Sequence, residues 1–210
     1  MNKSQSNNRI LYNLQKKPLL IVFSGPSGAG KDSVLNRLKQ KYPLQHITTI
    51  TTRPKRTTEK DNIDYHFISV QKFWEMVENK EFLEHAQVYG NWYGVPRSPV
   101  KQALDDGQDT IIKVDVQGAA TIKALLPQAI YIFLAPLEFD ELAYRLEKRQ
   151  TESSPELALR LKTVEEEMKQ LRLFDYVVAN KKGEIDIAVS QIEAIITAEK
   201  CRVAPREITL

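Results

Sequence analysis

Leu19-Leu20-Ile21-Val22-Phe23-Ser24-Gly25-Pro26-Ser27-Gly28-Ala29-Gly30-Lys31-Asp32-Ser33 is the stretch on which the interpretation of the whole chain depends. Its first five residues are apolar and predict a buried strand, and the glycine-rich turn after them opens a predicted helix over 31–40. In such a turn the backbone N–H groups curl toward an anion, and the helix N-terminus adds partial positive charge. Lys31 adds a full charge suited to phosphates. The segment from Gly25 to Ser33 therefore predicts a binding site for nucleotide phosphates.

Asp32 stands where this motif usually carries a serine or threonine, whose hydroxyl binds Mg²⁺. A carboxylate is also a hard oxygen ligand, which makes Asp32 a candidate metal ligand. An acid also suits the first turn of a helix for electrostatic reasons, and the sequence leaves both interpretations open. If Asp32 holds the metal, nucleotide binding should depend more strongly on Mg²⁺, because a bare carboxylate repels a triphosphate.

Strands and helices alternate along most of the chain. Beyond the first strand and helix, buried strands are predicted over 109–116, 129–135 and 175–179, and helices over 119–126, 137–149 and 185–200. This alternation predicts an α/β fold with a parallel sheet that is covered by helices on both faces.

Two stretches interrupt this alternation. Residues 48–96 carry threonine-rich and aromatic segments with strand-like patterning and a helix near 70–79, and they predict a small, mostly antiparallel insertion. Residues 150–155 form a polar hinge, and a helix with one apolar face follows it.

The composition excludes several classes of function. The 210 residues include 30 basic and 27 acidic side chains, and this excess is too small to indicate a nucleic-acid partner. The single cysteine, Cys201, excludes an internal disulfide and a multi-cysteine metal site. Residues 1–17 predict a flexible polar tail without a signal peptide, and no apolar run has the length of a membrane span. We expect a cytoplasmic protein, a monomer or small homo-oligomer, with no nucleic-acid or membrane partner.

A second set of motifs lies downstream of the glycine-rich turn. Arg53 and Arg56 follow several hydroxyl side chains, and guanidinium groups bind phosphate in bidentate fashion. The set comprises Thr51-Thr52-Arg53-Pro54-Lys55-Arg56 with Glu59, Asp64-Tyr65-His66-Phe67, Phe82-Leu83-Glu84-His85-Ala86, Gly90-Asn91-Trp92-Tyr93-Gly94 and Val114-Asp115-Val116-Gln117-Gly118. Together with the glycine-rich turn, this set resembles the guanylate kinases from about residue 19 to residue 197.

The resemblance implies an enzyme that transfers the γ-phosphoryl group of ATP to GMP with Mg²⁺ as cofactor. It implies a P-loop NTPase fold with a central parallel sheet flanked by helices, a GMP-binding insertion and a helical lid. Glu84 would accept hydrogen bonds from the guanine N1–H and 2-amino group, a pair of donors that adenine lacks. Asp115 would help to place the metal and the base, and Asn180 would contact ATP. The residues implied to bind GMP are Thr49, Arg53, Arg56, Tyr65, Glu84, Tyr93 and Asp115.

Arg145, Arg149 and Arg160 bracket the polar hinge and resemble the lid of nucleoside monophosphate kinases. Cations of this kind stabilise the charge that spreads over a phosphoryl group during transfer. A basic helix surface with ion pairs to Glu141 and Glu147 is the alternative. With Lys31 and Arg53, these three arginines complete the expected catalytic set. The domain prediction is a P-loop core over 18–47, 97–140 and 164–210, a GMP-binding insertion over 48–96 and a lid over 141–163.

Three residues besides Asp32 depart from the family pattern. Val95 replaces a hydroxyl residue, Lys113 replaces an acid two residues before Asp115, and Lys181 replaces an aspartate. Asp32 and Val95 also resemble ribose 1,5-bisphosphate phosphokinases, which makes that activity the second hypothesis. A non-catalytic guanylate-kinase-like binding module is the third, but such modules typically lose the lysine of the phosphate loop and the lid arginines.

Overall fold

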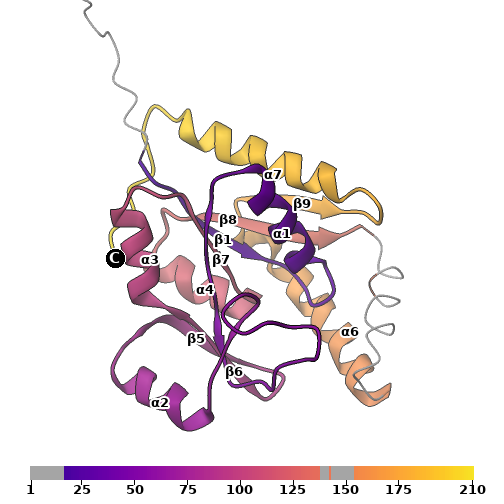
Figure 1. The fold of residues 1–210 in the computed structure, drawn as a ribbon. Coiled ribbons are helices and arrows are strands. Elements are labelled where there is room, and N and C mark those ends of the chain that lie inside the picture. Colours follow the sequence, from indigo (N-terminus) through magenta and orange to yellow (C-terminus); the bar gives the residue numbers. More distant parts are fainter. Residues whose placement is uncertain (1–16, 138–141, 143–153) are drawn as a thin grey trace, which may run out of the picture.

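The computed structural model describes residues 17–137, 142 and 154–210, with the backbone course alone for 154–161, and it contains a five-stranded sheet (Figure 1). The strand order is β2-β7-β1-β8-β9, and each neighbouring pair is parallel. The strands are β1 (Leu20–Ser24), β2 (Gln45–Ile47), β7 (Thr110–Lys113), β8 (Ile130–Pro136) and β9 (Tyr176–Asn180). Because parallel strands need crossover connections, the chain returns over the faces of the sheet between them.

Helices cover both faces of this sheet (Figure 1). They are α1 (Lys31–Lys41), α3 (Arg97–Asp105), α4 (Val116–Leu125), α6 (Ser154–Lys169), the 3₁₀ helix η1 (Gln170–Leu173) and α7 (Ile185–Lys200). On one face, Leu38 of α1 and Ile192 of α7 are buried against β1 and β8. On the other face, Val100 of α3 and Ile122 of α4 are buried with side chains of β1 and β7. The strands are therefore apolar on both sides, as parallel strands between two helical layers must be.

The insertion forms a second, smaller sheet with the order β4-β3-β6-β5. Its elements are β3 (Ile50–Thr51), β4 (His66–Phe67), α2 (Val70–Glu78), β5 (Phe82–Val88) and β6 (Asn91–Pro96). Tyr89 and Gly90, both with positive φ, turn β5 into antiparallel β6. Phe73 of α2 stacks on Phe82 of β5 with 4.6 Å between ring centroids, which packs the helix onto the sheet.

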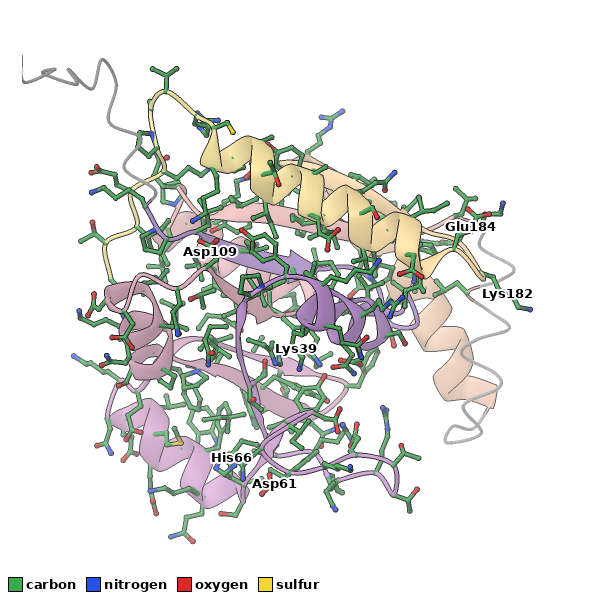
Figure 2. All side chains as sticks on the ribbon, turned by 45° about the horizontal axis from the view of Figure 1, so that its top comes forward. Lys39, Asp61, His66, Asp109, Lys182 and Glu184 are labelled. Carbon is green, nitrogen blue, oxygen red and sulfur yellow. The ribbon has the colours of Figure 1, made fainter. Side chains whose placement is uncertain are left out.

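Asp61 anchors the long loop between β3 and β4. Its Oδ1 accepts a hydrogen bond from the Phe67 N–H at 3.0 Å, and the His66 imidazole lies 3.6 Å away. Figure 2 shows Asp61 and His66 together at the end of the molecule that is remote from α7. The loop that carries both arginines of the predicted phosphate cluster is thereby tied to β4.

The main architectural prediction is confirmed, since the sheet is parallel and helices lie on both faces. Helix α7 has the predicted bounds, and α1 extends one residue further than expected. The strand expected over 109–116 ends at Lys113, because Asp115 caps α4. The insertion is mixed, because β3 and β4 pair in parallel. Most of the helix expected over 137–149 lies outside the described residues.

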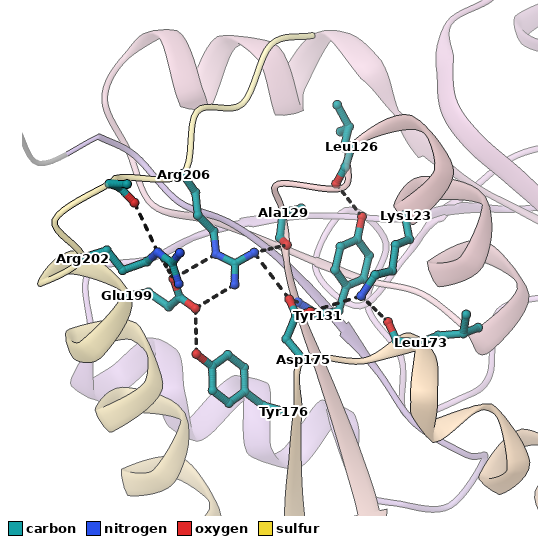
Figure 3. A network of polar contacts seen from close by, with 11 residues as sticks. Lys123, Leu126, Ala129, Tyr131, Leu173, Asp175, Tyr176, Glu199, Arg202 and Arg206 are labelled. Carbon is teal, nitrogen blue, oxygen red and sulfur yellow. Dashed lines mark hydrogen bonds and ion pairs between the residues drawn. The ribbon is translucent and has the colours of Figure 1, made fainter.

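The C-terminal segment is fastened to the core by a polar network (Figure 3). The guanidinium of Arg206 donates to Glu199 at 2.8 and 2.9 Å and to the Ala129 carbonyl at 3.1 Å. The side chain of Glu199 is fully buried and also accepts the Tyr176 hydroxyl at 2.7 Å. Beyond Arg206, Ile208 and Leu210 pack against the buried cluster that contains Leu20. No helix in the described part of the chain is long and apolar enough to cross a membrane.

Replacing Arg206 with alanine should lower the free energy of unfolding by about 3 kcal/mol, because the buried Glu199 carboxylate would lose its cation. Arg202 is the matched control, since its side chain is 49% exposed and its Nε lies 3.7 Å from Glu199. Arg202→Ala should cost less than about 1 kcal/mol. Urea denaturation of both variants measures the difference, and equal losses would contradict the buried-pair explanation.

Candidate active site

A cavity of about 620 Å³ lies between the carboxyl ends of the core strands and the insertion. It joins the glycine-rich turn after β1 to side chains of β5, β6 and β7 and of the segments that flank β3. Most residues predicted from the sequence line it: Gly25, Ser27, Gly28, Gly30, Lys31, Asp32, Thr49, Arg53, Arg56, Tyr65, Glu84, Tyr93 and Asp115. Residues from segments 90 positions apart in the chain therefore face one space, at the edge of the sheet where open α/β folds bind ligands.

The remaining predicted site residues lie elsewhere. Pro26, Ala29, Ser33 and Asn180 do not line the cavity. The buried amide of Asn180 donates to the Ala29 carbonyl at 2.7 Å, so it supports the turn from the end of β9. Arg145 and Arg149 lie outside the described residues, as does the side chain of Arg160, and these three remain predictions from the sequence.

The glycine-rich turn adopts the curled backbone that the sequence predicts. Gly25, Gly28 and Gly30 have φ values of 146°, 85° and 91°, which non-glycine residues rarely adopt. A Cβ at Gly25 would lie 2.3 Å from the Leu134 carbonyl oxygen, so the turn can sit against β8 only with glycine there. The Lys31 ammonium donates to the carbonyls of Gly25 and Pro26, and burial lowers its pKa.

Glu167 of α6 faces the same turn. It lines the cavity, its carboxyl accepts a hydrogen bond from the Ser27 backbone N–H, and Lys31 lies close by. Burial raises the pKa of Glu167 to about 7, although the charge of Lys31 opposes this effect. A carboxyl group thus contacts an amide of the phosphate loop in this structure.

Asp32 and Lys113 form an ion pair across the cavity. The side chain of Lys113 is 4% exposed at the end of β7, whereas that of Asp32 is 58% exposed at the start of α1. Burial alone would lower the pKa of Lys113, but Tyr65 and Asp32 outweigh burial and raise it. Lys113 is therefore a permanent cation beside the phosphate loop.

Arg53 and Arg56 converge on Glu59. The Arg53 Nη2 donates to Glu59 at 2.7 Å, and the Arg56 backbone N–H donates to the other carboxylate oxygen at 2.9 Å. Arg53 also donates from Nε to the Tyr93 hydroxyl at 3.2 Å. Although burial opposes it, the hydrogen bond from Arg53 lowers the pKa of Glu59. Glu59 thus holds the guanidinium of Arg53 and the backbone of Arg56, whose Nη1 lies 3.7 Å from the same carboxylate. Arg53 Nη1 also donates to the Pro54 carbonyl at 2.8 Å, and the guanidinium N–H groups that these contacts leave over can bind an anion.

Glu84 is a buried acid at the far end of the cavity. Its residue is 5% exposed on β5, and its Oε2 has no hydrogen-bond partner among the described residues. Burial and then the charge of Asp115 raise the pKa of Glu84 to about 8. Gly118 of α4 leaves room for this carboxyl, since a Cβ there would lie 2.8 Å from Oε1. The site therefore presents an acceptor that a ligand can satisfy.

Asp115 and Thr49 connect the two halves of the site. Asp115 is the N-cap of α4 and accepts the Gly118 N–H at 2.8 Å. The Thr49 hydroxyl donates to the Lys113 carbonyl at 3.0 Å, which fastens the start of the insertion to β7. Val95, one of the departures from the family pattern, is 1% exposed in the core and does not line the cavity.

Three charged residues that line the cavity received no role from the sequence: Glu59, Lys113 and Glu167. Glu59 stands inside the quoted arginine motif, so its spacing from Arg53 and Arg56 was an available signal. In the sequence, Lys113 stands out only because it replaces an acid of the family pattern. Glu167 belongs to the run Glu165-Glu166-Glu167, and nothing in that run distinguishes the one side chain that faces the turn.

The known proteins most relevant to this chain are guanylate kinases, by family model, by sequence and by structure. The family model "Guanylate kinase" matches residues 16–199. A guanylate kinase of Desulfitobacterium hafniense (strain Y51) is 42% identical over 190 residues, which cover 90% of this chain and 94% of that protein. A "Guanylate kinase 2, chloroplastic/mitochondrial" of Oryza sativa subsp. japonica is 42% identical over 92% of this chain and 69% of that protein. The crystal structure of guanylate kinase from Anaplasma phagocytophilum has a TM-score of 0.75 and 29% identity, covering 90% of this chain and 89% of that one.

Glu84→Gln should stabilise the substrate-free protein at high pH. The folded-state pKa of about 8 lies above the ordinary 4.5, so protonated Glu84 favours folding at low pH and this contribution is lost as the pH rises through 8. Glutamine cannot ionise, so the gain in the free energy of unfolding should be about 2–4 kcal/mol at pH 9 and much smaller at pH 5. Urea denaturation at both values tests this, with exposed Glu78→Gln as control. A gain independent of pH would contradict the burial argument.

Proposed function

Because the chain belongs to the guanylate kinase family and transfers the γ-phosphoryl group of ATP to GMP, we propose that both phosphates meet in the 620 Å³ cavity. The observation that carries this proposal is the juxtaposition of three features. A phosphate loop, an arginine pair and a buried carboxyl without a hydrogen-bond partner on Oε2 face one space.

The arginine pair is assigned to the phosphate of GMP. Arg53 and Arg56 are oriented by Glu59, and Tyr93 receives a hydrogen bond from Arg53. Tyr65 packs edge-on against Tyr93 with 5.9 Å between ring centroids, so its side chain belongs to the same cluster. Guanidinium groups held in this way recognise a dianionic phosphate with little loss of side-chain entropy on binding. Thr49, directly before β3, supports the cluster by its hydrogen bond to the Lys113 carbonyl at the end of β7.

Glu84 is assigned to the guanine base. As a carboxylate it accepts both the N1–H and the 2-amino group, which satisfies the buried oxygen that has no partner in the structure. Adenine has an acceptor at N1 and would leave the buried carboxylate unpaired. The neighbouring Asp115 repels the negative charge of Glu84, and the hydrogen-bond donors of guanine offset that repulsion.

The turn from Gly25 to Ser33 is assigned to ATP. Its amides and Lys31 bind the β- and γ-phosphates. Lys31 then gives up its hydrogen bonds to the Gly25 and Pro26 carbonyls and contacts the phosphates instead. The contact between Glu167 and the Ser27 N–H must also yield, since that amide lies within the loop. Asn180 keeps the loop in shape through Ala29.

Asp32 and Asp115 suit Mg²⁺ that arrives with the nucleotide. Both carboxylates line the cavity, and Asp32 is 58% exposed there. Within residues 17–137, 142 and 154–210, no group of three His, Cys, Asp or Glu side chains is arranged to hold a metal by itself. Mg²⁺ in nucleotide kinases is bound by one or two carboxylates plus phosphates, which matches this donor set. When held by Asp32 and Asp115 together with the nucleotide, the ion would supply positive charge that offsets the charge developing during transfer.

The chemistry needs no covalent intermediate on the protein. The bond between the γ-phosphorus and the β–γ bridging oxygen breaks, and its electron pair remains on ADP. An anionic oxygen of the GMP phosphate forms the new bond, so no proton has to be removed from the acceptor. The residues therefore act by holding the two phosphates in line and by stabilising charge.

Wild-type protein should form ADP from Mg·ATP with GMP and at most weakly with AMP, UMP, CMP or ribose 1,5-bisphosphate, offered separately. The physical reason is that Glu84 pairs with donors that only guanine presents among these acceptors. Coupled detection of ADP measures the rates. Turnover only with the sugar bisphosphate would overturn the base assignment, and ATP binding without turnover of any acceptor would favour a binding module.

Glu84→Gln should lower kcat/KM for GMP by ~10²-fold or more, because the amide replaces a charged acceptor with a donor that faces the guanine N–H groups. The KM for ATP should change little. In the wild type, GMP affinity should increase as the pH rises from 6 to 8, since only ionised Glu84 accepts both donors and its pKa is about 8. Calorimetric titration measures this dependence, which should be weaker in the variant, where only the second ionisation of the GMP phosphate, at about pH 6, still changes the affinity. Equal loss for all acceptors would contradict the assignment.

A further inference from the structure

Lys113 is a buried cation between the two phosphate sites. Its side chain is 4% exposed and lines the cavity, and it belongs to none of the groups assigned to ATP, GMP or Mg²⁺. Resting on that function, we propose that Lys113 is a further catalytic residue whose ammonium group contacts the phosphoryl group as it passes from ATP to GMP.

The backbone of Lys113 is held rigidly by the sheet. Lys113 is the last residue of β7 and pairs in parallel register with Phe23 of β1, two residues before Gly25. The next N–H, that of Val114, donates to the Phe23 carbonyl at 3.1 Å, and the Thr49 hydroxyl donates to the Lys113 carbonyl at 3.0 Å. The side chain therefore starts from a fixed point beside the phosphate loop, where a catalytic group needs little reorganisation.

On the ATP side, the ammonium of Lys113 reaches the loop itself. It pairs with Asp32, the residue that follows Lys31, and the charges of Lys31 and Lys113 repel each other. Because Asp32 is mostly exposed, water weakens its attraction to Lys113. The ion pair can therefore open when a more highly charged anion binds. A phosphoryl group with two or three charged oxygens is such an anion.

On the GMP side, Lys113 shares an aromatic neighbour with Arg53. The Lys113 Nζ lies 4.2 Å from the centre of the Tyr65 ring, and the guanidinium carbon of Arg53 lies 5.5 Å from the same centre. Lys113, which pairs with Asp32 of the loop, thus contacts the same Tyr65 ring as Arg53, the arginine assigned to the GMP phosphate.

This position suits a charge that develops between the two substrates. During transfer, negative charge spreads over the equatorial oxygens of the γ-phosphoryl group, and a positioned cation in a water-poor site stabilises it. The proposal changes neither the bonds nor the electrons of the step, since Lys113 keeps its proton throughout. The competing explanation is that Lys113 only neutralises Asp32, which would otherwise repel the triphosphate.

Lys113→Met should lower kcat with GMP by ~10²-fold while the KM values for ATP and GMP change several-fold at most, because the contact is made mainly during transfer. Lys113→Arg, which keeps the charge, should retain more of kcat than Lys113→Met. Binding gives an independent readout. Affinity for a bisubstrate analogue that joins adenosine and guanosine through five phosphates should fall more than affinity for ATP or GMP alone. Lys39→Met, on an exposed part of α1 outside the cavity, is the matched control (Figure 2).

A double-mutant cycle separates the proposal from the competing explanation. If Lys113 contacts the phosphoryl group, Lys113→Met should slow an Asp32→Ser background about as strongly as it slows the wild type. If Lys113 only neutralises Asp32, the Asp32→Ser/Lys113→Met protein should match Asp32→Ser, and that result overturns the proposal. Unchanged kcat in Lys113→Met overturns it as well. Wild-type turnover of GMP in the same assay tests the proposed function separately, and urea denaturation confirms that each variant is folded.

Discussion

The parallel hydrogen bonding of β1 with β7 is the constraint on which the active site depends. It sets Phe23 beside Lys113, so the phosphate loop that follows β1 and the residues Val114 and Asp115 that follow β7 emerge at one edge. The pairing of β1 with β8 on the other side brings Gly25 against the Leu134 carbonyl. Since the side chains of these strands are buried on both faces, neither element can shift without disturbing the core.

That rigid edge carries several titratable groups that are buried or half-buried. Glu84, Asp115 and Glu167 all have raised pKa values because burial disfavours their ionised forms, and burial lowers the pKa of Lys31. A chain would gain stability by replacing such groups with apolar ones. The substrates explain why these groups are retained, since their phosphates and guanine N–H groups form the interactions that these groups lack in the free protein. Catalytic sites commonly carry such local instability, which the surrounding core offsets.

How far the sequence predicts this structure depends on the length and regularity of each signal. The apolar run before Gly25 and the helical periodicity of 185–200 are strong signals, and β1 and α7 form there as expected. Strand β2 has three residues and only Ile47 buried, which is too short for a periodic signal. Helix α3 was not predicted; Pro96 is its N-cap and Pro99 lies in its first turn, where proline is tolerated because its absent N–H would have no partner. In the site, motifs located the arginines and Glu84, whereas Glu167 depends on a tertiary contact with Ser27.

Two of the departures from the family pattern, Asp32 and Lys113, contact each other in the folded chain. Asp32 replaces a neutral hydroxyl and Lys113 replaces an acid, and the two side chains pair although 81 positions separate them. The usual combination carries one negative charge, while this pair is neutral. The site is therefore one unit more positive where two polyanions must approach each other. Because the exposed partner is the acid and the buried one is the base, an incoming phosphate meets the lysine once Asp32 turns away. A carboxylate in the phosphate loop is thus compatible with phosphoryl transfer, since it is matched by a cation that can serve the reaction itself.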